Sequence, residues 1–285
     1  GYYKTLQDAL AVAKEGDVSL LLTDTVVGDD VKVTVPVTIE GLANGKKLPT
    51  LTYDNTVNAW AIFEINADLT IQNLNMVIKN AKQTGVLVVK NKSTLTMDTV
   101  ELTVAEVTTY NGICVIRLYK EDTHAVLRNC KVSYTDGYWT SNAGAFIMFD
   151  YDFADRTVII ENTTIDATGA KEGCAPISIV GADENSNNYV EIINSTLTPS
   201  AGAPLFLNLN IDNVIADELL LSKTTDGNVD TYTVILPNGL GSFTFTVTNG
   251  TNGTDGKDGK DGVDGKDGTN GTNGVDGKDG ANGTD

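Results

Sequence analysis

The chain has 285 residues, 41% of them apolar, and its 38 acidic and 20 basic side chains give a formal net charge of −18. An excess of negative charge this large repels nucleic-acid phosphates and anionic lipid headgroups, so neither is expected as a partner. No apolar run approaches the roughly 20 residues that a membrane-spanning helix requires, so we expect no membrane insertion by this segment. The composition is typical of a secreted or cell-surface protein that must stay soluble.

One amphipathic helix is predicted near the start, over about residues 4–16, within the stretch YKTLQDALAVAKEGD. From Leu6 onward its apolar residues recur at i, i+3, i+4 and i+7, which places them on one helical face. Thr5 can serve as the N-cap, with Asp8 three residues later as its acidic partner. Gly16 can adopt the left-handed conformation that ends a helix. No other part of the chain has this helical pattern.

After this helix one motif recurs, in which alternating apolar residues lead into a turn residue and a further short strand. The motif occurs as VTIEGLAN, LTIQNLNM, LTMDTVEL, AVLRNCKV, VIIENTTI and VEIINSTL, with Gly41, Asn73, Thr99, Asn129, Asn162 and Asn194 at the turn position. Asparagine suits such a corner because it tolerates positive φ and because stacked asparagine side chains can hydrogen-bond to one another.

A second motif, a short apolar strand, keeps step with the first. It occurs as WAIFEI, GVLVV, GICVIRL, GAFIMF, APISIV and APLFLNL. Strands of a β-sandwich are not expected to keep such a register. Two motifs locked to one period of about thirty residues instead indicate a solenoid, in which each coil adds one strand to several parallel sheets.

The opening helix, the strand VSLLLTD and the coil VTVPVTIEG resemble the right-handed parallel β-helix family with pectate-lyase-like architecture, especially the non-catalytic modules of bacterial surface proteins. The resemblance covers about residues 3–212. It implies an all-β head, a right-handed parallel β-helix over residues 1–212, whose capping helix covers the unpaired strand edge at the end of the stack. Because this architecture hosts lyases, hydrolases, adhesins and phage spikes, the resemblance leaves the activity open.

The C-terminal part has a different pattern. Residues 213–249 include DTYTVILPNGLGSFTFTV, which predicts a two-stranded hairpin that closes the head and joins it to the tail. Residues 250–285 are unbroken Gly-X-Y triplets without proline, in which Y is always Asp or Asn. A strict glycine period of three is the signature of a collagen triple helix, so we expect a collagen-like stalk and a homotrimer. A flexible linker is the alternative.

Candidate catalytic and metal-binding residues lie in the stretch FDYDFAD and in the preceding repeat. Alternation places Asp150 and Asp152 on one face of an extended segment. With Lys120 they are the candidate catalytic groups. Neighbouring coils end in further acids, Glu121, Asp183, Glu184 and Asp212, and strands about 4.8 Å apart could supply the carboxylate spacing of a glycoside hydrolase. Together with Asp155, Asp150 and Asp152 are the candidate ligands of calcium, and no other cofactor is expected. The alternative is that these residues are polar turns on an acidic surface.

Aromatic residues gather in the loops that follow the third strand of successive coils and at nearby strand ends. They are Tyr110, Tyr119, Tyr134, Tyr138, Trp139 and Tyr151. Exposed rings beside acidic groups are typical of contact with sugars or proteins, so these residues are the candidate ligand-binding set, for glycans or a host surface protein. The alternative is that the rings fold back and cover the sheets. The three cysteines have no disulfide or zinc spacing and are interpreted as buried small hydrophobes.

Three functional hypotheses follow. The first is a non-enzymatic, extracellular structural or adhesive protein of a bacterial cell surface, with a β-helix head on a collagen-like stalk. The second is a polysaccharide lyase or glycoside hydrolase of the β-helix fold. The third is a component of a phage tail fibre or spike. The fold serves all three equally, so the site residues have to decide among them.

Overall fold

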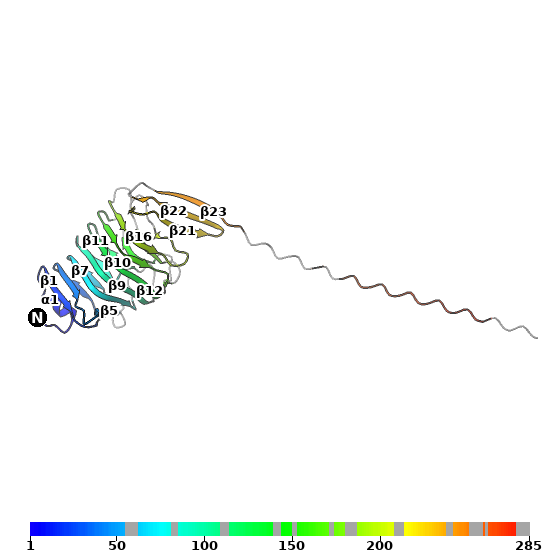
Figure 1. The fold of residues 1–285 in the computed structure, drawn as a ribbon, viewed down its shortest axis with the longest axis horizontal. Coiled ribbons are helices and arrows are strands. Elements are labelled where there is room, and N and C mark those ends of the chain that lie inside the picture. Colours follow the sequence, from blue (N-terminus) through cyan, green and yellow to red (C-terminus); the bar gives the residue numbers. More distant parts are fainter. Residues whose placement is uncertain are drawn as a thin grey trace, which may run out of the picture. The chain divides into compact units, whose positions relative to one another are not determined.

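The computed structural model describes residues 1–54, 62–80, 85–108, 114–138, 144–149, 153–170, 174–179, 187–207, 214–237, 242–250, 259 and 262–277. The chain divides into two compact units, Gly1–Asn249 and Gly250–Asp285. The first unit is a parallel β-solenoid, in which strands of successive repeats stack side by side (Figure 1). This confirms the predicted all-β solenoid architecture.

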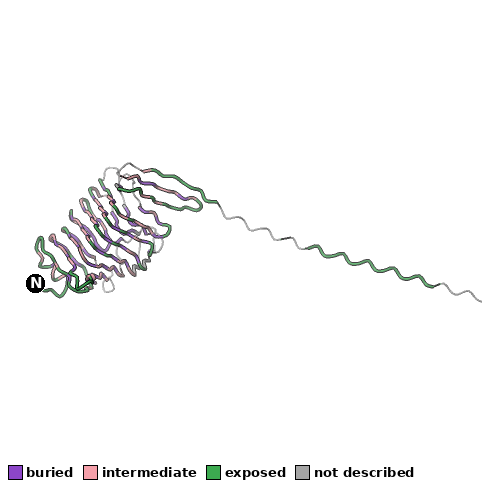
Figure 2. Tube along the Cα trace, viewed as in Figure 1, coloured by how far each residue is buried: buried purple, intermediate pink, exposed green. Residues whose placement is uncertain are grey.

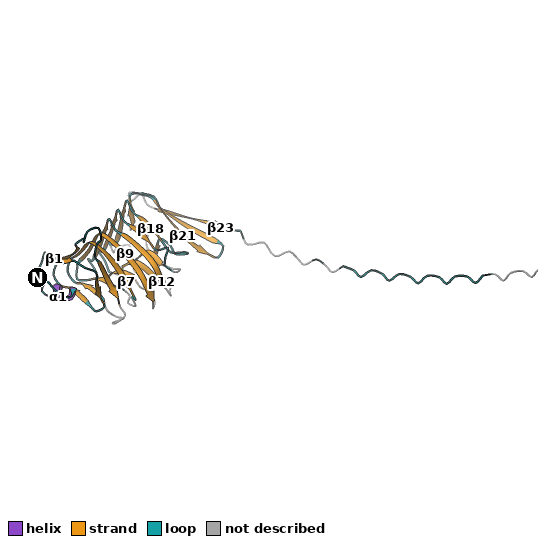
Figure 3. Ribbon diagram, turned by 60° about the horizontal axis from the view of Figure 1, so that its bottom comes forward, coloured by secondary structure: helices purple, strands orange, loops and turns teal. Residues whose placement is uncertain are grey.

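The larger sheet of the solenoid carries the turn motif. Its described strands are β1 (Asp17–Leu21), β2 (Thr25–Val27), β4 (Val37–Gly41), β5 (Thr50–Asp54), β7 (Leu69–Lys79), β9 (Thr94–Thr108), β11 (His124–Arg128), β12 (Lys131–Tyr138), β14 (Thr157–Glu161), β15 (Thr164–Asp166), β17 (Tyr189–Ile193), β18 (Thr196–Thr198) and β20 (Val214–Ala216). The sheet bends between its two halves, so each described coil before β20 contributes two strands or two halves of one strand to it (Figure 3).

The smaller sheet carries the second, short apolar motif. Its described strands are β3 (Val31–Val33), β6 (Phe63–Ile65), β8 (Leu87–Val89), β10 (Cys114–Leu118), β13 (Gly144–Phe149), β16 (Cys174–Ile179) and β19 (Phe206–Leu207). The two locked sequence motifs therefore correspond to the two sheets.

The core lies between the sheets and is built from side chains in register. One inward row of the smaller sheet consists of Val31, Phe63, Leu87, Ile116, Ile147, Ile177 and Phe206. The first six of these side chains are fully buried, and the last packs partly buried against the same core. Figure 2 shows that buried positions follow the strands from coil to coil. Burying a side chain of this size contributes about 1.5–3 kcal/mol, so repeated rows of them hold the solenoid together.

The predicted corner residues adopt the predicted backbone conformation. Positive φ angles between 45° and 56° occur at Asn73, Thr99, Asn129, Asn162 and Asn194. The amide of Asn194 donates to the side chain of Asn162 at 2.7 Å, and that of Asn129 donates to Asp98 at 3.0 Å. The side chains therefore bond along the stack as predicted, although their partner is more often a carboxylate than another asparagine.

Gly41 occupies the first corner for a different reason. It ends β4 and lies outside the group of residues with positive φ. A Cβ atom at this position would lie 2.2 Å from the carbonyl oxygen of Asn73 and 2.8 Å from the Cβ atom of Leu74. The close approach of the next coil, rather than the backbone conformation, excludes every other residue here.

A second corner, not predicted from the sequence, precedes the strands of the larger sheet. Lys92, Asp122, Asp155 and Asn187 have positive φ and each stands two residues before a strand. The next residue of each coil is polar and buried, and these residues are Ser93, Thr123, Arg156 and Asn188. Their side chains satisfy main-chain groups of the corner, as Thr123 does by donating to the carbonyl of Lys120 at 2.7 Å.

Arg156 is fully buried inside this column. Its Nη1 donates to the carbonyl of Leu118 at 3.2 Å, and its Nε and main-chain N–H both donate to Oδ1 of Asn188, at 3.3 and 3.0 Å. The guanidinium carbon lies 5.4 Å from the centre of the Phe149 ring. Asn188 in turn donates to the carbonyl of Phe153 at 2.8 Å. The buried guanidinium thus links three neighbouring coils.

The helix α1 (Leu6–Ala11) is shorter than the predicted span of residues 4–16. Thr5 is its N-cap, as predicted, and accepts a hydrogen bond from the main-chain N–H of Asp8 at 3.1 Å. Both leucines of the helix are buried in the core of the solenoid. The capping chemistry and the buried face were therefore predicted correctly, and the C-terminal boundary was not.

The helix ends early because a separate turn leads the chain into β1. In this turn the N–H of Lys14 donates to the carboxylate of Asp17 at 2.8 Å, which closes the loop one turn after the helix. Gly16 has the predicted left-handed conformation, with φ of 81°, but it belongs to this turn and donates to the carbonyl of Pro36 at 2.8 Å.

A separate antiparallel sheet follows the solenoid, and we call it the C-terminal sheet. It consists of β21 (Leu220–Asp226), β22 (Val229–Ile235) and β23 (Ser242–Thr248), in that order. The predicted hairpin is β22 and β23. Strand β21 was not predicted, although the Asp-Gly pair before β22 is a typical hairpin signal. The predicted head ended at residue 212, whereas β20 still pairs in parallel with β17.

One carboxylate is held firmly within this sheet. The side chain of Asp230 is only 7% exposed and pairs with Nζ of Lys223 at 2.8 Å. It also accepts hydrogen bonds from Thr225 at 2.7 Å and Asn249 at 3.0 Å. The hydrogen bond from Asn249, followed by those from Lys223 and Thr225, lowers the pKa of Asp230 to about 2.

In the second unit, residues 259 and 262–277 form neither helix nor strand and are exposed along their whole length. A Cβ atom added at any described glycine of these triplets would meet no other atom within 4 Å. Within one chain, packing therefore gives no reason for glycine at every third position.

Candidate functional site

Five predicted site residues lie outside the described part of the chain. These are Asp150 and Asp152 of the candidate catalytic and calcium groups, and Tyr110, Trp139 and Tyr151 of the candidate ligand-binding set. The side chain of Tyr138 is also outside it, and only its backbone is described, at the end of β12.

Tyr134 does not lie on a contact surface, which corrects its inclusion in the ligand-binding set. Its side chain is 4% exposed and belongs to the core cluster. Burial raises the pKa of its phenol well above the ordinary value, and the neighbouring thiol of Cys174 adds to this effect. The residue lies within β12, where buried and outward-facing positions alternate. Tyr134 takes a buried position, whereas Lys131 and Thr135 are exposed. This tyrosine is a core residue of a strand, which neither the contact surface nor the alternative of loop rings folded over the sheets predicted.

Tyr119 is half-buried and lies in a cluster of charged side chains on the outer face of the smaller sheet. The guanidinium carbon of Arg117 lies 4.8 Å from the centre of its ring, and Nζ of Lys90 lies 5.5 Å from it. Nζ of Lys90 also hydrogen-bonds to Glu64 at 3.2 Å. Lys32 extends the cluster, with its Nζ 4.0 Å from the same carboxylate.

The strand register explains why these residues meet. Lys32, Glu64, Val88 and Arg117 are successive positions of one outward row that crosses four coils. Tyr119 follows Arg117 by two residues and therefore points to the same side. Residues separated by about thirty positions in the chain thus lie one strand apart, which no local pattern within one coil could indicate.

The cluster is net positive, because the carboxylate of Glu64 stands among three cations, Lys32, Lys90 and Arg117. Burial by itself would raise the pKa of Glu64, but the hydrogen bond and charge of Lys90, the amide of Asn66 and the charge of Lys32 outweigh it, so that the pKa lies below its ordinary value. The carboxylate is therefore ionised at neutral pH. A tyrosine ring with two cations near it, one of which also binds an ionised carboxylate, offers stacking, hydrogen bonding and charge within one surface.

Of the candidate catalytic and calcium-binding residues, the described part of the chain includes Lys120 and Asp155. Lys120 is exposed at the turn after β10. Asp155 is exposed, has φ of 59°, and accepts a hydrogen bond from the amide of Asn187 at 3.0 Å, so its place is the second corner. No group of three or more His, Cys, Asp or Glu side chains within the described ranges is arranged to hold a metal ion.

The cysteines behave as predicted. Cys114, Cys130 and Cys174 are free thiols and all three are buried. Burial raises the pKa of Cys130 to about 11 and that of Cys174 to about 12, so both remain protonated and unreactive at neutral pH.

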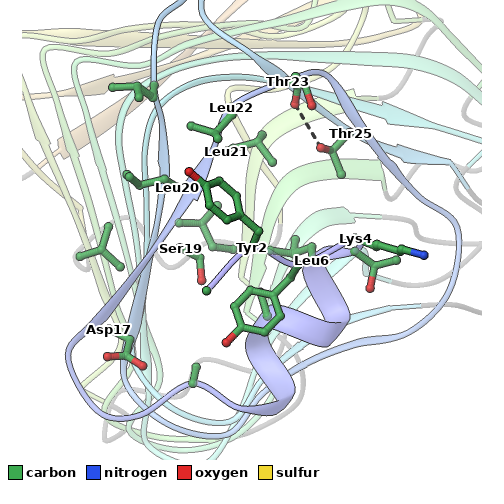
Figure 4. A pocket seen from close by; sticks show the side chains of 18 of the residues that line it. Tyr2, Lys4, Leu6, Asp17, Ser19, Leu20, Leu21, Leu22, Thr23 and Thr25 are labelled. Carbon is green, nitrogen blue, oxygen red and sulfur yellow. Dashed lines mark hydrogen bonds between the residues drawn. The ribbon is translucent and has the colours of Figure 1, made fainter.

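A groove of about 960 Å³ opens between the N-terminal segment and the edge strand β1 (Figure 4). Tyr2, Leu20 and Leu22 lie along it, and all three are exposed. Lys4 and Asp17 are the charged residues of its lining. This groove was not predicted from the sequence. The signal was the apolar alternation of VSLLL, which puts Val18, Leu20 and Leu22 on the outward side of the edge strand, where other strands of this sheet carry polar residues.

Comparisons of the chain with protein-family models, with curated proteins and with solved structures returned no match. Among the described residues, no helix has the length and hydropathy that crossing a membrane would take. The fold defines the class of this chain, a parallel β-solenoid.

Proposed function

We propose that this chain is an extracellular structural and adhesive protein of a bacterial cell surface. It presents a β-solenoid head on a collagen-like stalk and assembles as a homotrimer. The observation behind this proposal is that one chain combines a rigid solenoid with an uninterrupted Gly-X-Y tail. The first supplies a rigid display surface, and the second supplies a spacer between that surface and an anchor.

The solenoid fits this role as a right-handed β-helix of the pectate-lyase-like kind, since that handedness is the rule for parallel crossovers. Helix α1 acts as the cap of its first coil, because Leu6 and Leu10 close the core at that end. Covering the end protects the stack from pairing with other chains.

The tail is consistent with a collagen-like stalk, because no contact among the described residues of a single chain requires glycine at every third position. Only glycine fits at the axis of three wound chains, which explains a period that packing within one chain does not require. Lysine at X and aspartate at Y can pair between chains where proline would otherwise stabilise the helix. As a rod, the tail would extend about 110 Å, against about 35 Å for a flexible coil of the same length.

The stalk is tested by the mass in solution of the full chain and of a chain truncated after Asn249. We expect the full chain, of 30.2 kDa, to sediment as a trimer at low temperature and to give the circular dichroism of a triple helix. The truncated chain should lose that signal and associate more weakly. A full chain that remains monomeric at every concentration would contradict the proposal.

The adhesive surface is the cluster around Tyr119. We expect the protein to be retained on members of an array of acidic and neutral glycans, and Tyr119→Ala to weaken retention about tenfold, as loss of a stacked, cation-flanked ring does. Tyr189→Ala is the matched control, since that tyrosine is 38% exposed on the other sheet and should have no effect.

Two outcomes would overturn the assignment of this surface: no wild-type binding to any glycan, or equal losses in the two variants. Release of unsaturated or reducing ends from a bound polysaccharide would favour the enzymatic hypothesis instead.

A further inference from the structure

One face of the C-terminal sheet exposes a row of apolar side chains on its outer strand β23, beside the Lys223–Asp230 ion pair that lies on the same face. On β23, Phe243, Phe245 and Val247 alternate onto this face with exposures of 51%, 45% and 42%. Strand register places Leu221 of β21, which is 55% exposed, and Tyr232 of β22 on the same face. The rings of Tyr232 and Phe245 stack with centres 5.1 Å apart. Soluble monomers rarely expose a row of three apolar side chains with a stacked tyrosine on one strand, even beside an ion pair.

The opposite face of the sheet already has a partner. Leu220 and Ile235, which pair across β21 and β22, pack against the core of the solenoid. Ser222 of the same face accepts a hydrogen bond from the main-chain N–H of Leu205 at 3.0 Å. The sheet is therefore fixed to the head by one face, and its aromatic face points away from that contact.

The chain itself indicates what covers the aromatic face. Strand β23 ends at Thr248, and the first Gly-X-Y triplet begins at Gly250. Val247 is three residues from Gly250, so the two cannot be more than about 11 Å apart. If three tails wind together from Gly250, three copies of β23 must converge within that reach. The residues forced together would be those of the exposed face and of the outer edge of β23, which no described strand pairs.

We propose that the aromatic face of the C-terminal sheet is the interface at which three copies of this chain meet and start the triple helix. The inference rests on the proposed function, since it supplies the contact that a trimeric stalk needs. The partner is two further copies of this chain, and the central residues are Phe243, Phe245 and Val247.

The physical need for such an interface follows from the composition of the tail. The tail contains no proline, so each residue pays the full conformational entropy of ordering when three chains wind together. An interface directly before the first triplet holds three tails at high effective concentration and in one register. Winding then becomes intramolecular, and a stalk that is marginal by itself becomes stable.

The test uses the full chain and the double substitution of Phe243→Thr with Phe245→Thr. Threonine retains β propensity and alternates on the other face of the same strand. We expect the wild type to be a trimer, and the variant to need at least a tenfold higher concentration for trimers and to lose the triple-helix signal with them. The matched control is Thr244→Ala with Thr246→Ala, on the opposite face, which should leave both unchanged.

A second variant keeps the test informative if the double substitution unfolds the sheet. Val247→Cys should form disulfide-linked dimers on oxidation of the full chain, whereas Thr246→Cys should not. The background is low because the three natural cysteines are buried.

The outcomes separate the two proposals. A wild type that is trimeric, a double variant that is equally trimeric, and no cross-link at Val247→Cys would overturn this interface and leave the stalk intact. A wild type that is monomeric at all concentrations would overturn both. A wild type that stops at a dimer through this face would overturn the trimeric interface.

Discussion

Replacing Gly41 by asparagine is expected to lower the free energy of unfolding by about 3 kcal/mol, although asparagine is the residue that most other coils carry at this corner. The reason is steric. The new Cβ atom would lie 2.2 Å from the carbonyl oxygen of Asn73 and 2.8 Å from the Cβ atom of Leu74. Neither neighbour can move without shifting the next coil. Urea unfolding followed by circular dichroism measures the effect.

The reciprocal substitution is the control. Asn129→Gly should cost about 1 kcal/mol or less, because glycine adopts φ of 54° without strain and the lost hydrogen bond to Asp98 lies at the surface. If Gly41→Asn were as stable as the wild type, the coils would be able to separate at this point, and the steric role of Gly41 would be wrong.

Replacing the buried Arg156 by methionine is expected to cost about 3 kcal/mol. The substitution preserves most of the apolar volume but removes the donors to the carbonyl of Leu118 and to Oδ1 of Asn188. That carbonyl then lacks its guanidinium donor in the interior. Thermal unfolding and the urea midpoint would both fall.

Arg128→Met is the matched control for this prediction. Arg128 pairs with Glu161 at 3.1 Å, but its side chain is 45% exposed, so we expect a change of about 0.5 kcal/mol or less. If Arg156→Met proved as stable as the wild type, apolar packing would replace the buried hydrogen bonds without loss, and the linking role assigned to this arginine would be wrong.

The candidate site illustrates how far local pattern extends. Side chains alternate between the two faces of a strand, so Val132 and Tyr134 share one face and Ser133 lies on the other. Interpreting this segment as a strand, rather than a loop, would therefore have placed the ring of Tyr134 inside. For Tyr119 no such signal existed. Lys90, which lies by its ring, and Glu64, which Lys90 binds, come from earlier coils, and only the register between strands brings them into one cluster.

The sequence by itself determined the features that arise within one coil. The two locked motifs specified the two sheets, the corner asparagines specified positive φ, and Thr5 specified the start of the helix, because alternation, backbone strain and capping act over a few residues. The tertiary structure alone decided the steric need for glycine at position 41, the buried corner that holds Arg156, and the exposed face around Phe245. Each of these depends on what the next coil or the next strand covers, and contacts between coils join residues about thirty positions apart, beyond the reach of any local rule.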